Sequence, residues 1–217
     1  MKKIISFSLW GNNPKYTIGA IRNAELTPII YPGWISRFYC GESVPTEIIK
    51  TLISLPHTEV VMMDVDGDWT GMFWRFYACE DSDVMLSRDT DSRLSNREKL
   101  AVDEWLESDK DFHIMRDHPY HNTEILGGMW GVRNGLLKNI KELISDYTKG
   151  DFWQVDQNFL REKIYPLVIN NNFTHDSYLN YNINSKPFPS ERINKEFIGD
   201  VFDENENRHP EYYLKIY

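Results

Sequence analysis

Two aspartates, Asp89 and Asp91, have a spacing that suits a divalent cation. They follow the short apolar run 84–86, which has the composition of a buried strand. Because side chains alternate along an extended segment, carboxylates at positions i and i+2 point the same way. Such a pair suits one hard divalent cation, and a cation held by so few carboxylates commonly bridges the phosphates of a substrate. These residues therefore point to chemistry on a phosphate-bearing donor.

The place of this pair distinguishes it from the other Asp-x-Asp pairs of the chain. Asp89 and Asp91 lie between an apolar strand and a helix whose start is marked by Ser95 and Glu98, an S-x-x-E capping box. The other pairs have the ordinary explanation of solvated loop carboxylates. They occur at positions 64–66, 66–68, 81–83 and 109–111. Position in the predicted fold, and not the motif alone, selects Asp89 and Asp91.

Length, charge and cysteine usage narrow the class of protein. The 217 residues fit one domain with a sizeable core, and the formal net charge is −9. This acidity and the lack of a basic stripe argue against a nucleic-acid-binding surface. No apolar run approaches the roughly 20 residues of a membrane span, and the apolar stretch near the N-terminus is too short for a signal peptide. With Cys40 and Cys79 expected as buried thiols, we expect a cytoplasmic enzyme.

The apolar pattern predicts alternating strands and helices. Strands are expected over residues 3–10, 35–40, 60–63, 84–86, 112–115 and 167–169. Helices are expected over residues 16–26, 47–55, 72–78, 95–106, 136–147 and 152–165. Pro28 is expected to close the first helix and Pro166 to stop the last one.

This order of elements is typical of a largely parallel sheet with helices on both faces. Ligands of such sheets bind beyond the carboxyl ends of the strands. Five features of the sequence would meet at that edge: Asp64, Asp66, Asp89, Asp91 and the turn at Gly11.

Several motifs, taken in order, resemble a known family. Asp89-Thr90-Asp91 is followed by Gly127-Gly128-x-Trp130-Gly131, by Asp156-Gln157, and by His175 before Lys186-Pro187-Phe188. Together they resemble the small metal-dependent GT-A glycosyltransferases, most closely the compact single-domain type encoded by large algal viruses and some bacteria. The resemblance covers roughly residues 3–203.

The resemblance implies an α/β, GT-A-like fold in a single domain over residues 1–217, with a mostly parallel central sheet and helices on both faces. The nucleotide-binding half would span about residues 1–92 and the acceptor half about residues 93–217. It also implies a hexosyltransferase that moves a sugar from a nucleotide sugar, with a UDP-sugar as the expected donor, to a glycan or another hydroxyl acceptor.

The resemblance further implies a role for each candidate site residue. Asp89, Asp91 and His175 would hold Mn²⁺ or Mg²⁺ against the donor diphosphate, and imidazole beside carboxylates favours Mn²⁺. The nucleotide and its diphosphate would contact Leu9, Trp10, Gly11, Tyr16, Asp66, Arg75 and Lys186. Trp10 or Tyr16 would stack on the base, and Asp64 or Asp66 would bind the base or ribose. The sugar or acceptor would contact Gly127, Gly128 and Trp130.

Asp156 and Gln157 are the candidate catalytic residues. Breaking a sugar–phosphate bond builds positive charge on the anomeric carbon and negative charge on the leaving diphosphate, which a cation with Lys186 and Arg75 would stabilise. If Asp156 deprotonates the acceptor directly, the configuration inverts. If Asp156 or Gln157 supports an oxocarbenium ion, the configuration is retained. The Asp-Gln pair with a distal histidine resembles retaining members more.

Two alternatives remain open from the sequence. The run 60–67 ends in Asp64-Val65-Asp66-Gly67, which looks like the opening motif of a haloacid-dehalogenase-type phosphatase, with Asp68 where that motif has threonine. The aromatic content also fits a non-catalytic carbohydrate-binding module. Independently of that alternative, Trp130 beside the glycines is the tryptophan expected to contact a sugar, and Trp153 is expected in the core. Hydrolysis of free phosphomonoesters would favour the phosphatase, and sugar binding without metal would favour the module.

Overall fold

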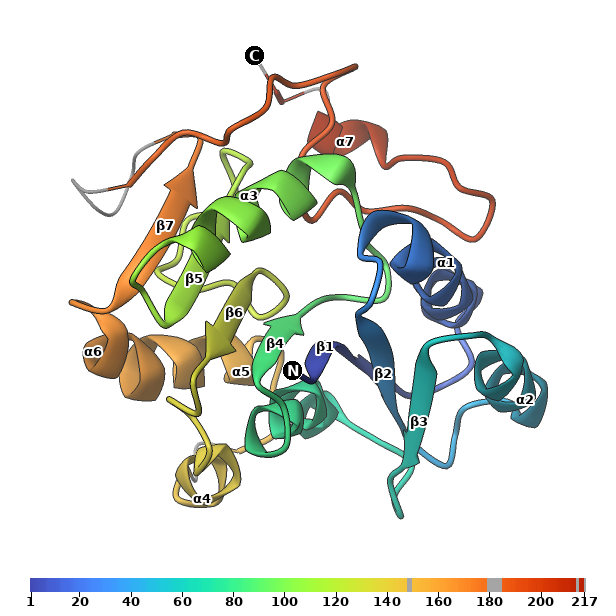
Figure 1. The fold of residues 1–217 in the computed structure, drawn as a ribbon. Coiled ribbons are helices and arrows are strands. Elements are labelled where there is room, and N and C mark those ends of the chain that lie inside the picture. The colour runs from blue at the N-terminus through green and yellow to red at the C-terminus, as the bar shows by residue number, and fades with distance from the viewer. Residues whose placement is uncertain (148–149, 179–184, 214, 217) are drawn as a thin grey trace.

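A seven-stranded mixed sheet organises the molecule (Figure 1). The computed structural model describes residues 1–147, 150–178, 185–213 and 215–216. The strands are β1 (Lys3–Leu9), β2 (Ile35–Cys40), β3 (Thr58–Met62), β4 (Val84–Ser87), β5 (Phe112–Arg116), β6 (Trp130–Arg133) and β7 (Asn172–Asp176). Their order in the sheet is β3-β2-β1-β4-β6-β5-β7, and only β6 runs antiparallel to its neighbours among these strands. The predicted α/β class with a mostly parallel sheet is confirmed.

Helices cover both faces of the sheet (Figure 1). One face carries α1 (Pro14–Ile30), α2 (Thr46–Ser54) and α3 (Asn96–Glu107). The other carries the 3₁₀ helix η1 (Trp69–Glu80), α4 (Ile140–Ser145), α5 (Val155–Phe159), the π-helical turn η2 (Leu160–Ile164) and α6 (Tyr165–Val168). The short helix α7 (Pro210–Tyr213) belongs to the C-terminal segment. Within the described residues, no helix is both long and apolar enough to cross a membrane.

The core explains why the first strand is so apolar. β1 lies in the middle of the sheet, and its residues from Ile4 to Leu9 are all buried, because helices cover it on both sides. On the side of α1 and α2, the Phe7 and Phe38 rings stack with centroids 4.8 Å apart. On the side of η1 and α5, Phe76 packs edge-on against Trp130 at 5.1 Å. Burial of these large side chains supplies the main stabilisation of the sheet edge that carries the site.

Proline positions account for two differences between the predicted and observed helices. α1 continues past Pro28 to Ile30, and the Tyr31 backbone N–H donates to the Thr27 carbonyl at 2.8 Å. Proline in a last turn removes one hydrogen bond without ending the helix. At the other position, the π-helical turn η2 immediately precedes Tyr165-Pro166, and such a turn accommodates the missing N–H and the ring. Helical structure therefore continues through Pro166, where the sequence analysis expected it to stop.

The strand predicted over residues 167–169 is wrong. These residues include the end of α6 and its C-cap residue, Ile169, and Val168 is buried as part of that helix. The strand of this region is β7, over 172–176. β6 was not predicted from the sequence either. Gly131 stands in the middle of β6 because a Cβ there would lie 2.7 Å from a Leu86 methyl on β4. This glycine obscures the apolar alternation that predicts a strand.

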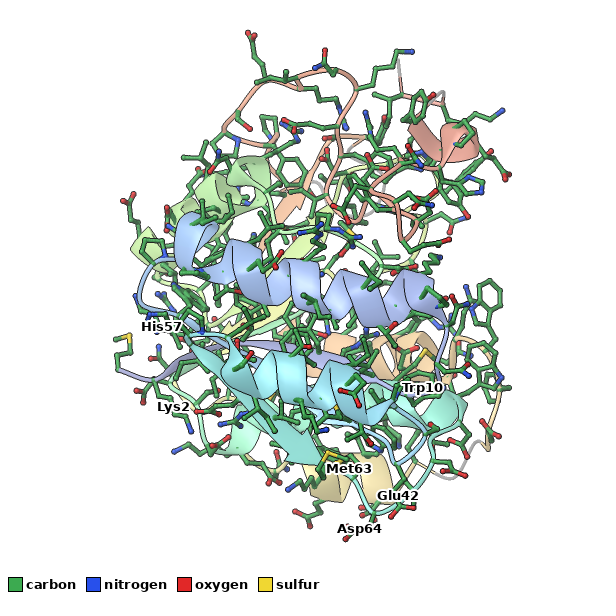
Figure 2. All side chains as sticks on the ribbon, turned by 90° about the vertical axis from the view of Figure 1, so that its right-hand side faces the viewer. Lys2, Trp10, Glu42, His57, Met63 and Asp64 are labelled. Carbon is green, nitrogen blue, oxygen red and sulfur yellow. The ribbon has the colours of Figure 1, made fainter. Side chains whose placement is uncertain are left out.

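The carboxyl ends of the parallel strands meet at one edge. Figure 2 shows Lys2 and His57, which precede β1 and β3, at one end of the molecule, and Trp10 and Asp64, which follow these strands, toward the other. Because β6 runs antiparallel to β4, the residues that precede β6 reach the same edge as those that follow β4. This reversal brings Gly128 beside Asp89.

Candidate active site

A cleft of about 530 Å³ lies at this edge, at the carboxyl ends of β1 and β4. It is lined from segments far apart in the sequence, including the start of α1, η1, the turn after β4 and the start of α5. Most of the residues that the sequence analysis selected line it. They are Leu9, Trp10, Gly11, Tyr16, Arg75, Asp89, Asp91, Gly127, Gly128, Asp156 and Gln157. The fold therefore brings these residues together, while their individual roles stay predictions.

Arg75 connects two carboxylates of the cleft. Its Nη2 donates to Asp156 Oδ2 at 2.7 Å, and its Nη1 donates to Asp89 Oδ1. The Arg75 backbone N–H donates to Ser8 Oγ at 3.0 Å, which fixes η1 against β1. Both Arg75 and Asp156 are buried, and this burial raises the pKa of Asp156 although the guanidinium acts against the shift. A buried carboxylate paired with one guanidinium can stabilise positive charge that develops beside it, because little water is present to screen the interaction.

Asp91 faces a different cation. Its Oδ2 lies 2.8 Å from Lys15 Nζ at the start of α1. Burial and the neighbouring Asp89 carboxylate raise the pKa of Asp91, and Lys15 opposes this shift. Two carboxylates that repel each other at the wall of a cleft are stabilised by added positive charge. The chemistry of this donor set fits a hard divalent cation.

The number of protein ligands near these carboxylates is small. In the part of the chain that the structure describes, no group of three or more His, Cys, Asp or Glu side chains is arranged to hold a metal ion. Asp89 and Asp91 offer two carboxylates, a number that leaves positions around a cation for water and for a substrate. Mg²⁺ and similar ions are commonly bound in this way, through one or two carboxylates together with substrate phosphates.

Gly127 and Gly128 allow the backbone to lie against the carboxylates. A Cβ at Gly128 would overlap Asp89 Oδ2, and a Cβ at Gly127 would overlap Asp156 Oδ2. Any other residue at these positions would displace one of the two side chains. The close approach of the backbone to Asp89 and Asp156 thus explains why glycine occupies both positions, whether or not a sugar binds there.

His175 does not lie with the aspartates, and its predicted role as a metal ligand is corrected. Its Nδ1 lies 2.9 Å from His113 Nε2, and its Nε2 lies 3.0 Å from Glu104 Oε2. The ring is buried and stacks on Phe188 with centroids 5.2 Å apart. β7 is separated from β4 by β6 and β5, so three inter-strand steps of about 4.8 Å lie between the two strands. The sequence carried no signal of this strand order.

Three further predicted contacts lie outside the cleft. Lys186 forms an isolated parallel β-bridge with His175, and its Nζ lies 3.3 Å from Glu104 Oε1. Trp130 is fully buried in the core, and its Nε1 donates to the Gly127 carbonyl at 3.1 Å, so it supports the glycine turn and cannot contact a sugar. Asp66 is exposed on the loop after β3, where its carbonyl accepts from Ser43 Oγ. The positions of Lys186 and Trp130 do not support their predicted contacts, whereas Asp66 is linked through Ser43 to the turn at Gly11 and its contact with the nucleotide stays a prediction.

Residues that the sequence analysis did not select complete the cleft. They include Ser8, Trp69, Met72, His121, Leu126, Met129, Trp153, Gln154, Gly199 and Val201. The C-terminal segment contributes because the Phe202 backbone N–H donates to the Asp91 carbonyl at 2.9 Å. Trp69 and Trp153 are exposed aromatic side chains, a property that a sequence pattern does not report.

His121 lines the cleft, and the hydrogen bond to its Nδ1 determines which ring nitrogen carries the proton. The Asp117 backbone N–H donates to its Nδ1 at 2.9 Å, so the proton of the neutral ring lies on Nε2. Burial, with the nearby charges of His118, Arg192 and Arg116, lowers the pKa of His121 to about 3. The ring is therefore a neutral hydrogen-bond donor at neutral pH.

This low pKa predicts that the protein loses stability in mild acid. A histidine of the unfolded chain titrates near 6.5, so the unfolded state binds more protons than the folded state between pH 6.5 and about 3. The contribution of neutral His121 is complete above pH 6.5 and declines as the pH falls, by up to about 1.4 kcal/mol per pH unit. Urea unfolding at about pH 7.5 and about pH 5 should show a smaller loss for His121→Gln than for the wild type. Equal losses in both proteins would contradict this prediction.

Comparison with known proteins agrees with this architecture. No protein-family model matches the sequence, and no curated protein matches it. The structure is similar to a glycosyltransferase involved in the glycosylation of the major capsid of PBCV-1, with a TM-score of 0.56 and 14% identity over 82% of each chain. It is also similar to glucosyl-3-phosphoglycerate synthase from Mycobacterium tuberculosis in complex with UDP, with a TM-score of 0.52 and 13% identity over 88% of this chain and 72% of that one. The chain has a GT-A-like glycosyltransferase fold.

A third similarity concerns ligands. Another structure of the mycobacterial synthase holds Mn²⁺, UDP and phosphoglyceric acid, and matches with a TM-score of 0.51 and 13% identity over 80% of this chain and 67% of that one. These likenesses identify the fold as GT-A-like. In this GT-A-like chain, the cleft lies where parallel strands of such sheets end, the usual place for their ligands.

Proposed function

We propose that the protein transfers a sugar from a nucleotide sugar, with a UDP-sugar as donor, to a hydroxyl acceptor, and that it requires a divalent cation. One observation carries the proposal: Asp89, Asp91, Arg75 and Asp156 meet in a single cleft at the carboxyl edge of a GT-A-like sheet. The similar structures that bind UDP and Mn²⁺ support the donor class.

Asp89 and Asp91 would hold the cation, Mn²⁺ or Mg²⁺, in this proposal. The bound cation would supply positive charge beside the donor diphosphate, which stabilises a leaving group as its negative charge grows. Lys15 and Arg75, which now neutralise these aspartates, would then be able to contact phosphate oxygens. The side chains of Lys15 and Arg75 would thus offset negative charge in both states, that of the aspartates without substrate and that of the diphosphate with it.

The nucleoside would lie along residues 9–16. The Gly11 backbone N–H donates to Ser43 Oγ at 2.8 Å, which fixes the turn after β1. Trp10 packs edge-on against Trp74 with centroids 6.0 Å apart, so it forms a fixed wall. Tyr16 is more exposed and is the better candidate to stack on the base.

Asp156 would support the sugar electrostatically. Its Oδ2 accepts from Arg75 and its Oδ1 accepts the Gln157 backbone N–H at 2.9 Å, so both oxygens are engaged. A carboxylate held in this way is better placed to stabilise positive charge on the anomeric carbon than to turn and deprotonate an acceptor. This geometry favours transfer with retention of configuration, with Gln157 beside the same face.

The proposal is tested by calorimetric titration of UDP into the protein with and without Mn²⁺. We expect binding that requires Mn²⁺ and is removed by a chelator. A protein that binds neither UDP nor another nucleoside diphosphate in the presence of Mn²⁺ or Mg²⁺ would refute the proposal. No structural observation favours the phosphatase alternative, since Asp64 and Asp66 are exposed outside the cleft.

A further inference from the structure

Two tryptophans at the rim of the cleft are exposed to solvent. Trp153 is 65% exposed and Trp69 is 46% exposed, and both line the cleft. The other five tryptophans of the chain are buried or partly buried. Large aromatic side chains left open beside a cleft mark a place where a ligand is bound, whereas scattered exposed apolar residues need no such explanation.

The structure holds these two tryptophans on one rim. The Trp69 backbone N–H donates to Asp151 Oδ1 at 3.1 Å, which ties the start of η1 to the segment that carries Trp153. Gln154, the next residue, has φ of 69°, a left-handed backbone conformation that is uncommon for a side chain of this kind. Such conformations cluster at functional sites.

The same segment leads directly to the proposed catalytic carboxylate. Trp153 precedes Asp156 by three residues, and Gln154, Asp156 and Gln157 all line the cleft with it. A molecule resting on Trp153 would therefore lie next to the sugar that Asp156 faces. In a transfer reaction, that is the place of the acceptor.

The charges around this rim indicate what kind of acceptor fits. Asp151 and Asp68 are exposed carboxylates of the rim. Among the described residues that line the cleft, Arg75 is the one lysine or arginine, and it is bound to Asp89 and Asp156. His121 is neutral. Among the described residues of this rim and cleft, a phosphate or carboxylate on the acceptor would meet negative charge, and the one lysine or arginine lining the cleft, Arg75, is already bound to two carboxylates.

We infer that the rim beside Trp153 is the acceptor subsite and that its occupant is an uncharged saccharide. The apolar C–H face of a pyranose packs on an aromatic ring, whose face is electron-rich, while the hydroxyl edge reaches polar groups such as Gln154. The inference rests on the proposed function. It separates this chain from the similar mycobacterial synthase, whose structure holds the anionic phosphoglyceric acid.

The test is saccharide binding to the protein loaded with Mn²⁺ and UDP. Methyl glucoside, methyl galactoside and methyl mannoside, together with disaccharides of these sugars, are the neutral probes. Glucose 6-phosphate and 3-phosphoglycerate are the anionic probes. Ligand-detected NMR and tryptophan fluorescence report binding. We expect at least one neutral probe to bind and both anionic probes to bind more weakly than it does.

Variants of the rim then locate the subsite. Trp153→Ala should weaken saccharide binding about 10-fold, whereas Trp153→Phe, which keeps an aromatic face, should weaken it about 3-fold or less. Ile53→Ala removes an equally exposed apolar side chain from α2 and should change nothing. UDP affinity, measured in the same samples, should stay within about 2-fold in every variant.

Three results for saccharide binding would overturn the inference. They are tighter binding of an anionic probe, no binding of any neutral probe, and saccharide binding that Trp153→Ala leaves unchanged. An equal loss of UDP affinity in Trp153→Ala would also overturn it, since Trp153 would then contact the nucleotide. UDP binding by the wild type keeps this test apart from the proposed function: if UDP binds and neutral saccharides do not, only the acceptor inference fails.

Discussion

Asp91→Asn is expected to weaken Mn²⁺-dependent UDP binding by about 100-fold or more. The substitution keeps the size of the side chain but removes one of the two anionic ligands proposed for the cation. It also removes the partner of Lys15, whose Nζ lies 2.8 Å from Asp91 Oδ2. Calorimetry of UDP binding at saturating Mn²⁺ measures the effect, and thermal unfolding verifies that the variant is folded.

The chain offers a matched control for this prediction. Asp64 and Asp66 have the same Asp-x-Asp spacing at the end of a parallel strand, yet both are exposed and neither lines the cleft. Asp64→Asn should leave UDP binding unchanged, and Asp66→Asn tests the predicted contact of Asp66 with the base or ribose. If these variants abolish hydrolysis of p-nitrophenyl phosphate and Asp91→Asn does not weaken UDP binding, the phosphatase alternative replaces the proposed transferase.

Local patterns in the sequence were sufficient to predict most of the sheet edge. A short apolar strand followed by Asp89 and Asp91 and then a capped helix predicts where those carboxylates lie, because parallel strands end together. Glycine pairs predict a close approach of the backbone, which the structure contains beside Asp89 and Asp156. These inferences succeed since each depends on neighbours in the sequence.

The errors concern residues whose position depends on the order of strands. His175 was expected to follow a strand over residues 167–169. It lies within β7 instead, and because β7 lies beyond β5 and β6, its side chain meets His113 and Glu104. No local pattern specifies that order. The family resemblance indicated a histidine ligand in this part of the chain, and it could not identify which histidine reaches the cleft.

The tryptophans illustrate the same limit. Trp130 beside the glycines was predicted to contact a sugar and Trp153 to lie in the core, whereas Trp130 is buried and Trp153 is exposed. Both residues have apolar neighbours in the sequence. Trp130 is buried because β6 lies inside the sheet, between β4 and β5, with Phe76 and Phe112 packed against the ring. Trp153 is exposed in the segment that precedes α5, next to Gln154, the N-cap residue of that helix. Burial here follows from tertiary packing, which residue type alone does not determine.

Asp156→Asn is expected to lower kcat for UDP-sugar turnover by about 100- to 1000-fold while UDP affinity changes little. Asparagine keeps the shape of the side chain and one oxygen that can accept the hydrogen bond that Arg75 donates at 2.7 Å, while its NH2 group cannot accept the Gln157 backbone N–H. What is lost is a negative charge, 1% exposed in the wild type, beside the carbon on which positive charge would develop. An interaction that strengthens only as charge develops appears in kcat and not in the affinity for the ground state.

Two measurements distinguish this role from a structural one. Asp109→Asn, at a carboxylate that is 85% exposed and remote from the cleft, is the matched control and should leave kcat unchanged. The anomeric configuration of the product, followed by NMR from the start of the reaction, should match that of the donor. If Asp156→Asn weakens UDP binding as much as it lowers kcat, Asp156 serves mainly to position Arg75 against the diphosphate. If the product forms with inverted configuration, Asp156 does not stabilise an oxocarbenium ion in a retaining reaction. Deprotonation of the acceptor then becomes the role that the position of Asp156 supports.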